Sequence, residues 1–209
     1  MTSGRLLAVG DIHGCRDLLV DLLAKVRPQP ADRLIFLGDY IDRGPDARGV
    51  IDELLTFRLS HPRSIFLKGN HEAMFLDFLA GRNLLLFLRN GGDATLSSYP
   101  QEGKIRIPQE HLDFLRNLDL HHETEDFIFV HAGLRPGLPL ADQQERDLLW
   151  IRSEFLDSDY DWGKTLVFGH TPFAAPLLTA NRIGLDTGAV YGRTLSCCDV
   201  RSRTCWHAP

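Results

Sequence analysis

Residues that suit metal binding recur where short apolar runs end. Runs such as LLAVG, LIFLG and LVFG are each followed directly by aspartate, asparagine or histidine. The five polar clusters are Asp11-Ile12-His13-Gly14, Asp39 with Asp42-Arg43-Gly44, Asn70-His71-Glu72, His131-Ala132-Gly133 and His170-Thr171. Because ligand sites of open α/β sheets lie at the carboxyl ends of strands, five such ends can bring their side chains to one crevice.

The residue types in these clusters predict a site for two divalent metal ions. Imidazole nitrogen and carboxylate or amide oxygen suit hard or borderline metals, and the clusters contain no cysteine, which argues against a thiolate site. We expect Asp11 and His13 to bind one ion, and Asp39 to bridge to the second through its two carboxylate oxygens. The predicted metal ligands are Asp11, His13, Asp39, Asn70, His131 and His170.

Two arginines are candidates for phosphate binding, because a guanidinium group forms paired hydrogen bonds with phosphate oxygens. Arg43 follows Asp42 directly, and Arg152 lies in the segment LLWIRSEF. The alternative for Arg43 is a surface pair with Asp42 or Asp46. The alternative for Arg152 is packing of its aliphatic stem on an apolar stretch, with the charge exposed.

Each cluster taken alone also has a structural interpretation. GDIHG resembles an ordinary turn between a strand and a helix, with Asp11 as the helix cap. A single histidine such as His131 or His170 is more often a hydrogen-bonded residue at a strand end than a ligand. Asp186 is either a capping residue of a turn or a brace behind metal-bound histidines. The recurrence of five clusters favours the metal site.

The segments between the clusters predict the elements that position them. The first hundred residues alternate short apolar runs with amphipathic stretches, which is typical of βαβ units. Asn90-Gly91-Gly92 predicts a loop, and the last third is richer in strand patterns. We find no repeat and no linker rich in Pro, Gly or Ser, and we therefore expect one domain over residues 1–209 with an α/β fold and a central, mixed sheet.

Composition excludes several classes of protein. A net charge of −5 and a pI near 6.0 give no general attraction to nucleic acid. No apolar run is long enough for a secretory signal or a membrane span, so we expect a cytoplasmic protein. Cys197, Cys198 and Cys205 lie near His207 and leave a small metal site open, but we interpret these cysteines as reduced strand residues.

Three motifs carry a resemblance to a known family. GDIHG at 10–14, GDYIDRG at 38–44 and GNHE at 69–72 resemble the signature motifs of the phosphoprotein phosphatases, a family of calcineurin-like metallophosphoesterases. The segments around His131 and His170 resemble the two later histidine motifs of that family. The likeness therefore extends over residues 10–171, and Arg152 in LLWIRS is similar to bacterial and phage-type members.

The resemblance implies a fold, a cofactor and two further roles. It implies a β-sandwich of mixed sheets flanked by helices, and two metal ions, manganese with iron or zinc as alternatives, bridged by Asp39 and a hydroxide. That hydroxide would attack phosphorus directly, with no covalent enzyme intermediate. In the family pattern His71 protonates the leaving oxygen and Asp42 orients His71.

The resemblance also implies a serine/threonine protein phosphatase that hydrolyses phosphomonoesters in phosphorylated proteins or small substrates. The alternative is a diadenosine tetraphosphate hydrolase. Those enzymes usually lack the aspartate found here at Asp42 and carry aspartate at the position of Glu72, so both residues favour the protein phosphatase. A third hypothesis is a binding module that has lost hydrolysis, but it predicts missing ligands. The sequence does not indicate the oligomeric state.

Overall fold

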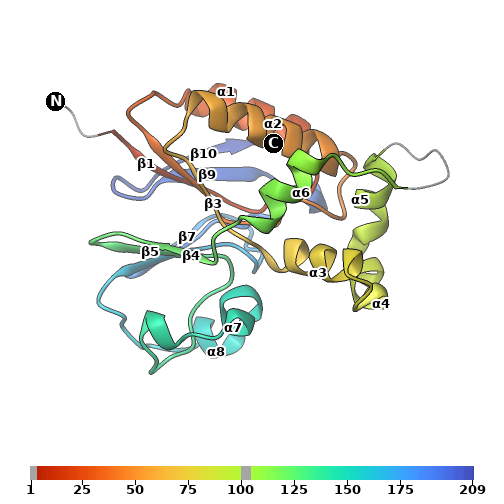
Figure 1. Cartoon of the computed structure of the whole chain (residues 1–209). Coiled ribbons are helices and arrows are strands. Elements are labelled where there is room, and N and C mark those ends of the chain that lie inside the picture. Colours follow the sequence, from red (N-terminus) through yellow and green to blue (C-terminus); the bar gives the residue numbers. More distant parts are fainter. Residues whose placement is uncertain (1–3, 100–104) are drawn as a thin grey trace.

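Two five-stranded sheets stack face to face, and helices cover both outer faces of the stack (Figure 1). This architecture comes from a computed structural model that describes residues 4–99 and 105–209. Each sheet contains parallel and antiparallel strand pairs. The predicted α/β sandwich of mixed sheets flanked by helices is therefore confirmed.

The first sheet has the strand order β10-β9-β1-β2-β3. Its parallel strands are β1 (Leu6–Val9), β2 (Arg33–Phe36) and β3 (Ile65–Phe66). The antiparallel strands are β9 (Leu195–Asp199) and β10 (Thr204–Ala208). The continuous apolar run of β1 fits its central place, because all four of its residues are buried.

The second sheet has the strand order β4-β5-β6-β8-β7. Strands β5 (Phe127–Val130), β6 (Thr165–Phe168) and β8 (Arg182–Gly184) are parallel. Strands β4 (His121–Glu123) and β7 (Leu177–Leu178) pair antiparallel at the two edges. Glu125 and Asp126 lie in the turn between β4 and β5.

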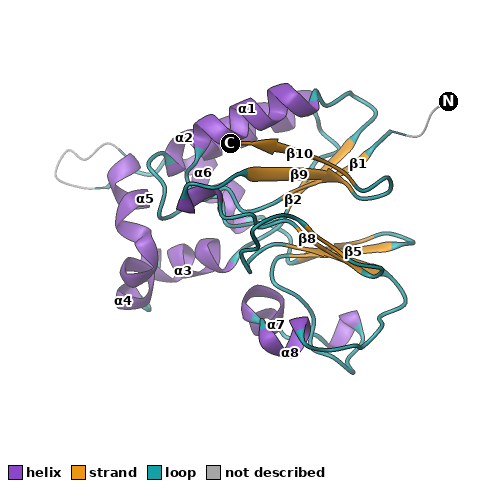
Figure 2. Ribbon diagram, turned by 180° about the vertical axis from the view of Figure 1, so that it is seen from behind, coloured by secondary structure: helices purple, strands orange, loops and turns teal. Residues whose placement is uncertain are grey.

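The outer faces of the sheets are covered by helices from different parts of the chain (Figure 2). Helices α1 (Arg16–Val26), α2 (Ala47–Ser60) and α6 (Gln109–Arg116) pack against the first sheet through one buried cluster. Helices α7 (Glu145–Trp150) and α8 (Ser153–Leu156) pack against the second sheet. Among the described residues, no helix is long and apolar enough to cross a membrane.

A third apolar cluster joins the two sheets. Leu6 and Ala8 of β1 point toward Phe129 and Val167 of the second sheet, whereas the intervening Leu7 packs under the helices. Successive side chains of a strand point to opposite faces, so one short strand serves both layers. Full burial of a Leu, Ile or Phe side chain contributes about 1.5–3 kcal/mol, so this cluster holds the sheets in a fixed relation.

Shorter helical segments extend one end of the sandwich. They are α3 (Asn70–Leu79), α4 (Leu84–Phe87) and α5 (Asp93–Ser98). The loop predicted at Asn90-Gly91-Gly92 is confirmed only as a break at Gly91, because Leu88–Gly92 is a short helical turn that joins α4 to α5 across a kink. Gly91 makes this turn possible with φ of 90°, a left-handed conformation that glycine adopts without steric cost. Two 3₁₀ turns lie at Leu140–Asp142 and Ala189–Tyr191.

Candidate metal centre and active site

The six predicted metal ligands lie together at the carboxyl ends of the parallel strands. The first sheet supplies its residues after β1, β2 and β3, and the second sheet supplies its residues after β5 and β6. All six side chains are buried, with at most 5% of each residue exposed. They are Asp11, His13, Asp39, Asn70, His131 and His170. Buried polar groups in such number need partners, which the chain supplies only in part.

Two hydrogen bonds connect the sheets within this cluster. The backbone N–H of His170, after β6, donates to the carboxylate of Asp11, after β1, at 3.0 Å. In the other direction, Nδ1 of His131 donates to the carbonyl oxygen of Leu37 at 2.8 Å. These contacts close the edge of the sandwich at the site and fix the two groups of ligands relative to each other.

Asp39 occupies the centre of the cluster. Its Oδ2 lies 3.5 Å from Nε2 of His13, and its Oδ1 lies 3.4 Å from Nε2 of His131. Its ligand atoms form one close group with His13 and His71, and another with His131 and His170. The two carboxylate oxygens therefore face two different sets of imidazoles, which is the arrangement expected of a bridging ligand.

Hydrogen bonds fix which imidazole nitrogens are free to bind a metal. Nδ1 of His13 contacts the carbonyl oxygen of Ile41 at 2.9 Å, and Nδ1 of His131 contacts that of Leu37. A carbonyl only accepts, so in each neutral ring Nδ1 carries the proton and Nε2 keeps its lone pair. Metal-binding histidines are commonly oriented in this way by a backbone carbonyl.

The spacing of the donor atoms fits coordination to a cation. Nε2 of His131 and Oδ1 of Asn70 are 2.9 Å apart, although both are acceptors in the orientation described. Two acceptors at this distance repel each other unless a cation lies beside both. Neighbouring ligands bound at about 2.1 Å to one ion are separated by about 3.0–3.4 Å, so the pair matches a shared metal.

The charges of the cluster favour the protonation states that metal binding requires. Burial lowers the pKa of His13 to about 3 and lowers the pKa of His131, so both rings are neutral near pH 7. Burial alone would raise the pKa of Asp39, but the surrounding imidazoles, with His131 and His71 first, hold it below the usual value. Asp39 is therefore ionised, and the rings of His13 and His131 beside it are neutral.

Backbone strain is concentrated at the site. Among the described residues, the non-glycine positions with left-handed backbone include His13 (φ 47°), Asp39 (φ 52°) and His170 (φ 62°). Asp42 and Arg43 adopt it consecutively, with φ of 70° and 67°. Each such residue costs on the order of 1–3 kcal/mol and persists only where the surrounding structure holds it. Strain is expected where side chains must point into one small volume.

Glycine is required at two of the turns for lack of space. A Cβ on Gly38 would lie 2.6 Å from the backbone nitrogen of Gly69. A Cβ on Gly169 would lie 2.1 Å from Oδ1 of Asp11, inside the ligand cluster itself. Any larger residue at Gly169 would displace the carboxylate of Asp11.

His71 and Asp42 form a buried pair beside the ligands. Nδ1 of His71 contacts Oδ2 of Asp42 at 2.7 Å, and the His71 ring lies edge-on to His13 at 4.6 Å between ring centroids. Nε2 of His71 is buried and has no hydrogen-bond partner among the described residues. Burial opposes protonation, but the carboxylates of Asp39 and Asp42 raise the pKa of His71 above its usual value. The imidazole can therefore hold a proton near neutral pH and present Nε2 to a ligand.

Glu72 has a structural role that the motif did not reveal. Its carboxylate accepts backbone N–H groups from Asp39 at 2.9 Å, Tyr40 at 2.8 Å and Gly69 at 2.8 Å. Burial raises the pKa of Glu72 to about 7 in spite of these donors. Glu72 thus joins the start of α3 to the loop that carries Asp39.

The two predicted phosphate-binding arginines border the cluster from opposite sheets. Nη1 of Arg43 donates to Nε2 of His13 at 2.9 Å, and its guanidinium lies 5.8 Å from the ring centroid of Tyr191. Nη1 of Arg152 donates to Oγ1 of Thr171, next to His170, at 3.2 Å. Both side chains are exposed, so both charges are available to an anionic ligand at the cluster.

Trp150 is a further residue at the site that sequence reasoning did not single out. Its indole meets the ring of His170 edge-on, with 6.2 Å between centroids, and it is 37% exposed. It also lines a hollow of about 570 Å³ between α3, α4 and α7, together with Met74 and Leu86. The only signal in the sequence was its place two residues before Arg152.

Asp186 and the histidines outside the five clusters belong to neither group of possible metal ligands among the described residues. Oδ1 of Asp186 accepts the backbone N–H of Gly188 at 2.9 Å, as expected for a turn, and Asp186 joins neither group of possible metal ligands. His111 is fully buried between the hydroxyl of Tyr99 and the carboxylate of Asp52. His61, His121, His122 and His207 also lie outside those two groups.

The cysteines near the C-terminus are strand residues, as predicted. Cys197 and Cys198 lie in β9, and Cys198 pairs directly with Cys205 of β10. All of them are free thiols, and none belongs to the possible metal sites found among the described residues.

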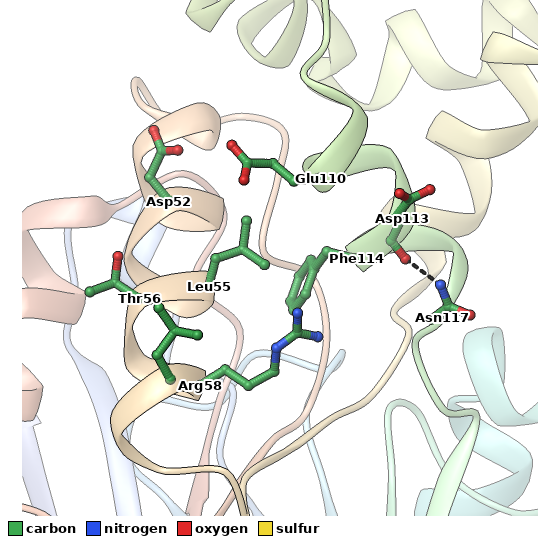
Figure 3. Close-up of a pocket in the computed structure, with 9 residues that line it drawn as sticks. Asp52, Leu55, Thr56, Arg58, Glu110, Asp113, Phe114 and Asn117 are labelled. Carbon is green, nitrogen blue, oxygen red and sulfur yellow. Dashed lines mark hydrogen bonds between the residues drawn. The ribbon is translucent and has the colours of Figure 1, made fainter.

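A hollow of about 640 Å³ between α2 and α6 is separate from this centre (Figure 3). It is lined by Leu55, Arg58 and Phe114 with carboxylates at its rim, and by none of the predicted site residues. We assign no chemistry to it, because none of the described residues with an unpartnered buried nitrogen lines it.

Comparison with known proteins gives a consistent family. The model of the calcineurin-like phosphoesterase family matches residues 4–193. The chain is 34% identical to the serine/threonine-protein phosphatase 1 of Salmonella typhimurium, over 90% of this chain and 88% of the relative. It is 27% identical to an asymmetrical bis(5'-nucleosyl)-tetraphosphatase of Anoxybacillus flavithermus, over 90% of this chain and 87% of the relative.

Solved structures extend the likeness to the fold. A crystal structure of a putative diadenosine tetraphosphatase superposes with a TM-score of 0.78 at 27% identity, covering 100% of this chain and 94% of that one. A protein serine/threonine phosphatase of Saccharomyces cerevisiae, similar to human PP5, gives a TM-score of 0.69 at 17% identity, covering 93% and 72%. The second likeness concerns the fold alone.

The family match spans most of the chain, and the family depends on a dinuclear metal centre of the kind that these His and Asp groups can form. The resemblance in the sequence motifs is thereby confirmed. The chain belongs to the calcineurin-like phosphoesterase family and is a hydrolase of phosphate esters.

Proposed function

We propose that this chain is a dinuclear, metal-dependent serine/threonine protein phosphatase that hydrolyses phosphomonoesters. The observation that carries the proposal is the buried pair of Asp42 and His71, joined at 2.7 Å beside the metal-ligand cluster. This pair places an imidazole nitrogen with no partner among the described residues next to Asp39, with 3.9 Å between Nε2 of His71 and Oδ2 of Asp39.

The pair suits an ester with a poor leaving group. Cleaving a phosphoserine or phosphothreonine ester releases an alkoxide, which is strongly basic and requires a proton in the transition state. A positioned proton donor typically contributes 10²–10⁴-fold to such a step. A nucleotide phosphate leaves as a stabilised anion and depends less on that proton. A buried His–Asp pair therefore favours the monoester substrate.

The metal ions have a proposed set of ligands. Asp11, His13 and Asp39 would hold one ion, and Asp39 would share the second ion with the remaining ligands. When bound, two such ions supply positive charge for the phosphoryl oxygens and a nucleophile at neutral pH. We propose manganese as the metal, with iron or zinc as alternatives, because the donors are imidazole and oxygen without thiolate. The ligands that complete the second ion are Asn70, His131 and His170.

The protein's own groups bind the phosphate and move the proton. Arg43 and Arg152 would bind the phosphate oxygens from two sides, because each guanidinium already lies within reach of a metal-ligand residue or its neighbour. His71 would hold the proton at Nε2 and donate it to the leaving oxygen. Asp42 would fix the ring through Nδ1 and stabilise its charged form.

Hydrolysis of dinucleoside tetraphosphates is the second candidate. It is supported by the 27% identity to a bis(5'-nucleosyl)-tetraphosphatase and to a putative diadenosine tetraphosphatase, each over at least 90% of the chain. The metal ligands proposed here serve that reaction equally well. Only the leaving group differs, so relative turnover separates the two candidates.

Other expectations from the sequence stay predictions. We propose that residues 1–209 act as one domain, because a single apolar cluster contains side chains of both sheets. A phosphorylated protein or small phosphoester as partner, the absence of nucleic acid binding and a cytoplasmic location are predicted from charge and composition.

The test is a comparison of three substrates with one preparation. Chelator-stripped protein is assayed on p-nitrophenyl phosphate before and after manganese is added, and then on a phosphothreonine peptide and on diadenosine tetraphosphate. Turnover restored by manganese with the peptide preferred supports the proposal. Preference for the dinucleotide moves the second candidate to first place. If no turnover of any of the three substrates is seen with any metal added, the result would instead support a binding module that has lost hydrolysis.

A further inference from the structure

Asp42 and Arg43 form a strained turn whose backbone is held from one side by a single segment. Both residues have left-handed backbone, which is rare for consecutive non-glycine residues. The N–H of Asp42 donates to Oγ1 of Thr95 at 2.8 Å, and the N–H of Arg43 donates to the carbonyl of Gly91 at 3.0 Å. These partners come from the kinked turn at Gly91 and from helix α5.

Thr95 makes a second contact with the same residue. Its hydroxyl donates to Oδ1 of Asp42 at 2.6 Å while its oxygen accepts the Asp42 N–H. Thr95 and Asp42 are both fully buried. A hydroxyl has one donor and two acceptor positions, so this two-point contact fixes the carboxylate relative to its own backbone. Oδ2 of Asp42 is then left for Nδ1 of His71 at 2.7 Å.

We propose that Thr95 is a positioning residue for the Asp42–His71 pair. This inference rests on the proposed role of His71 as proton donor. The hydroxyl aligns the Asp42 carboxylate, the carboxylate aligns the imidazole, and the imidazole presents its proton to the leaving oxygen. A buried carboxylate that loses one donor must find another or rotate, and either change moves Oδ2 away from His71.

Helix α5, which carries Thr95, is held in place by contacts that do not involve the metal ligands. Helix α5 is anchored at its other end, where Oγ of Ser98 accepts the backbone N–H of Arg48 at 3.2 Å and donates to the carbonyl of Thr95 at 2.7 Å. Ser98 therefore offers a matched control. Ser98→Ala removes two hydrogen bonds that hold α5 and leaves the hydroxyl of Thr95 in place.

The experiment compares Thr95→Val, which keeps the shape and removes the hydroxyl, with Thr95→Ser, which keeps the hydroxyl. Turnover is measured in manganese on phenyl phosphate, whose leaving group needs a proton, and on p-nitrophenyl phosphate, whose leaving group needs it less. We expect Thr95→Val to lower kcat on phenyl phosphate by about 10–100-fold, the usual effect of removing a supporting partner, and on p-nitrophenyl phosphate clearly less. Thr95→Ser and Ser98→Ala should stay within about threefold of the unaltered protein on both substrates.

A second measurement separates positioning from general damage. In the His71→Asn background, adding Thr95→Val should cause no further loss on phenyl phosphate, because the two residues act on one step. A full additional loss there, or an equal loss on both substrates, would overturn the role of Thr95. If His71→Asn alone leaves phenyl phosphate turnover intact, the proposed role of His71 fails instead.

Folding is controlled in the same series. Bound manganese and the unfolding temperature are measured for every variant. If Thr95→Val does not fold, Thr95→Ala takes its place and must show the same dependence on the leaving group. Wild-type turnover of Thr95→Ala on phenyl phosphate would also contradict the proposal.

Discussion

The two halves of the candidate metal centre have different surroundings. On the first sheet, His13 borders the imidazole of His71 at 4.6 Å between ring centroids and the guanidinium of Arg43 at 2.9 Å. On the second sheet, His131 and His170 lie against each other at 5.0 Å, and Trp150 packs on His170. Each half is thus bordered by one arginine, but the proton-transfer pair lies beside the first half and aromatic surface beside the second.

This difference separates two tasks. The segment from Asp11 to Glu72 supplies the predicted proton-transfer pair, one arginine and most of the ligands. The second sheet adds His131, His170 and Arg152. Of the residues that the structure describes, Asp39 alone belongs to both groups of possible ligands, through Oδ2 and Oδ1. The comparison therefore predicts that a change at Asp39 affects both halves, whereas a change at one histidine affects one.

The largest effect is expected for Asp39→Asn. An amide lacks the negative charge that attracts two cations, so both ions should be bound more weakly. Because a bound ion stabilises the transition state by several kcal/mol, we expect turnover of p-nitrophenyl phosphate to fall by more than about 1,000-fold. Metal content, measured by mass spectrometry on the same samples, should fall together with turnover.

The matched control for this variant is Asp17→Asn. Asp17 is an exposed carboxylate at the start of α1, near the loop of Asp11 in sequence but outside the cluster. It should retain full metal and turnover. An Asp39→Asn protein with normal turnover would show that the centre has been placed on the wrong residues.

Intermediate effects are expected when a ligand is removed from only one half. His170→Ala should leave about one ion per chain, bound by the donors of the first sheet, and His13→Ala should leave about one ion in the second half. Loss of a ligand together with its orienting contacts typically lowers affinity or activity by 10–100-fold. Metal stoichiometry and turnover are measured at matched manganese concentrations.

Either variant with no metal at all would show that the two halves are not separable. In that case the ions bind as one cooperative unit, and the distinction drawn from their surroundings has no consequence for affinity. Two ions retained in His170→Ala would instead remove His170 from the set of ligands.

The fold was predictable to the extent that the apolar runs were unambiguous. LLAV and FIFV are short and continuous, and both became strands buried on two faces. The expected loop at Asn90-Gly91-Gly92 is reduced to a kink, because glycine pairs mark left-handed backbone without specifying what surrounds it. Here the left-handed Gly91 breaks the chain between two helices that follow each other directly.

The site was predictable where chemistry alone selects the residue type. Aspartate and histidine after an apolar run, as at Asp11 and His131, are poor strand residues and suggest a ligand. Glu72 and Thr95 could not be interpreted in this way, because their partners are backbone N–H groups and one carboxylate that are distant in sequence. A threonine in a short helix carries no local sign of such a contact.

The smallest effects are expected at the two arginines. They test the comparison between the two halves of the metal centre, because each half has one arginine. Arg43→Lys and Arg152→Lys keep the charge but lose the paired hydrogen bonds to phosphate. Because a hydrogen bond to a charged group contributes about 1.5–3 kcal/mol and lysine keeps the charge, Arg43→Lys should lower kcat/KM for p-nitrophenyl phosphate by roughly tenfold, at the low end of that range. Arg152→Lys should have the smaller effect, since the contact of Arg152 with Thr171 is longer, at 3.2 Å, and Arg43 is also held through its backbone by Gly91.

Inhibition by inorganic phosphate should weaken in parallel in both variants, while the amount of bound metal stays constant. A larger loss in Arg152→Lys than in Arg43→Lys would mean that phosphate is bound mainly from the second sheet, and the division of tasks between the two halves would have to be reversed.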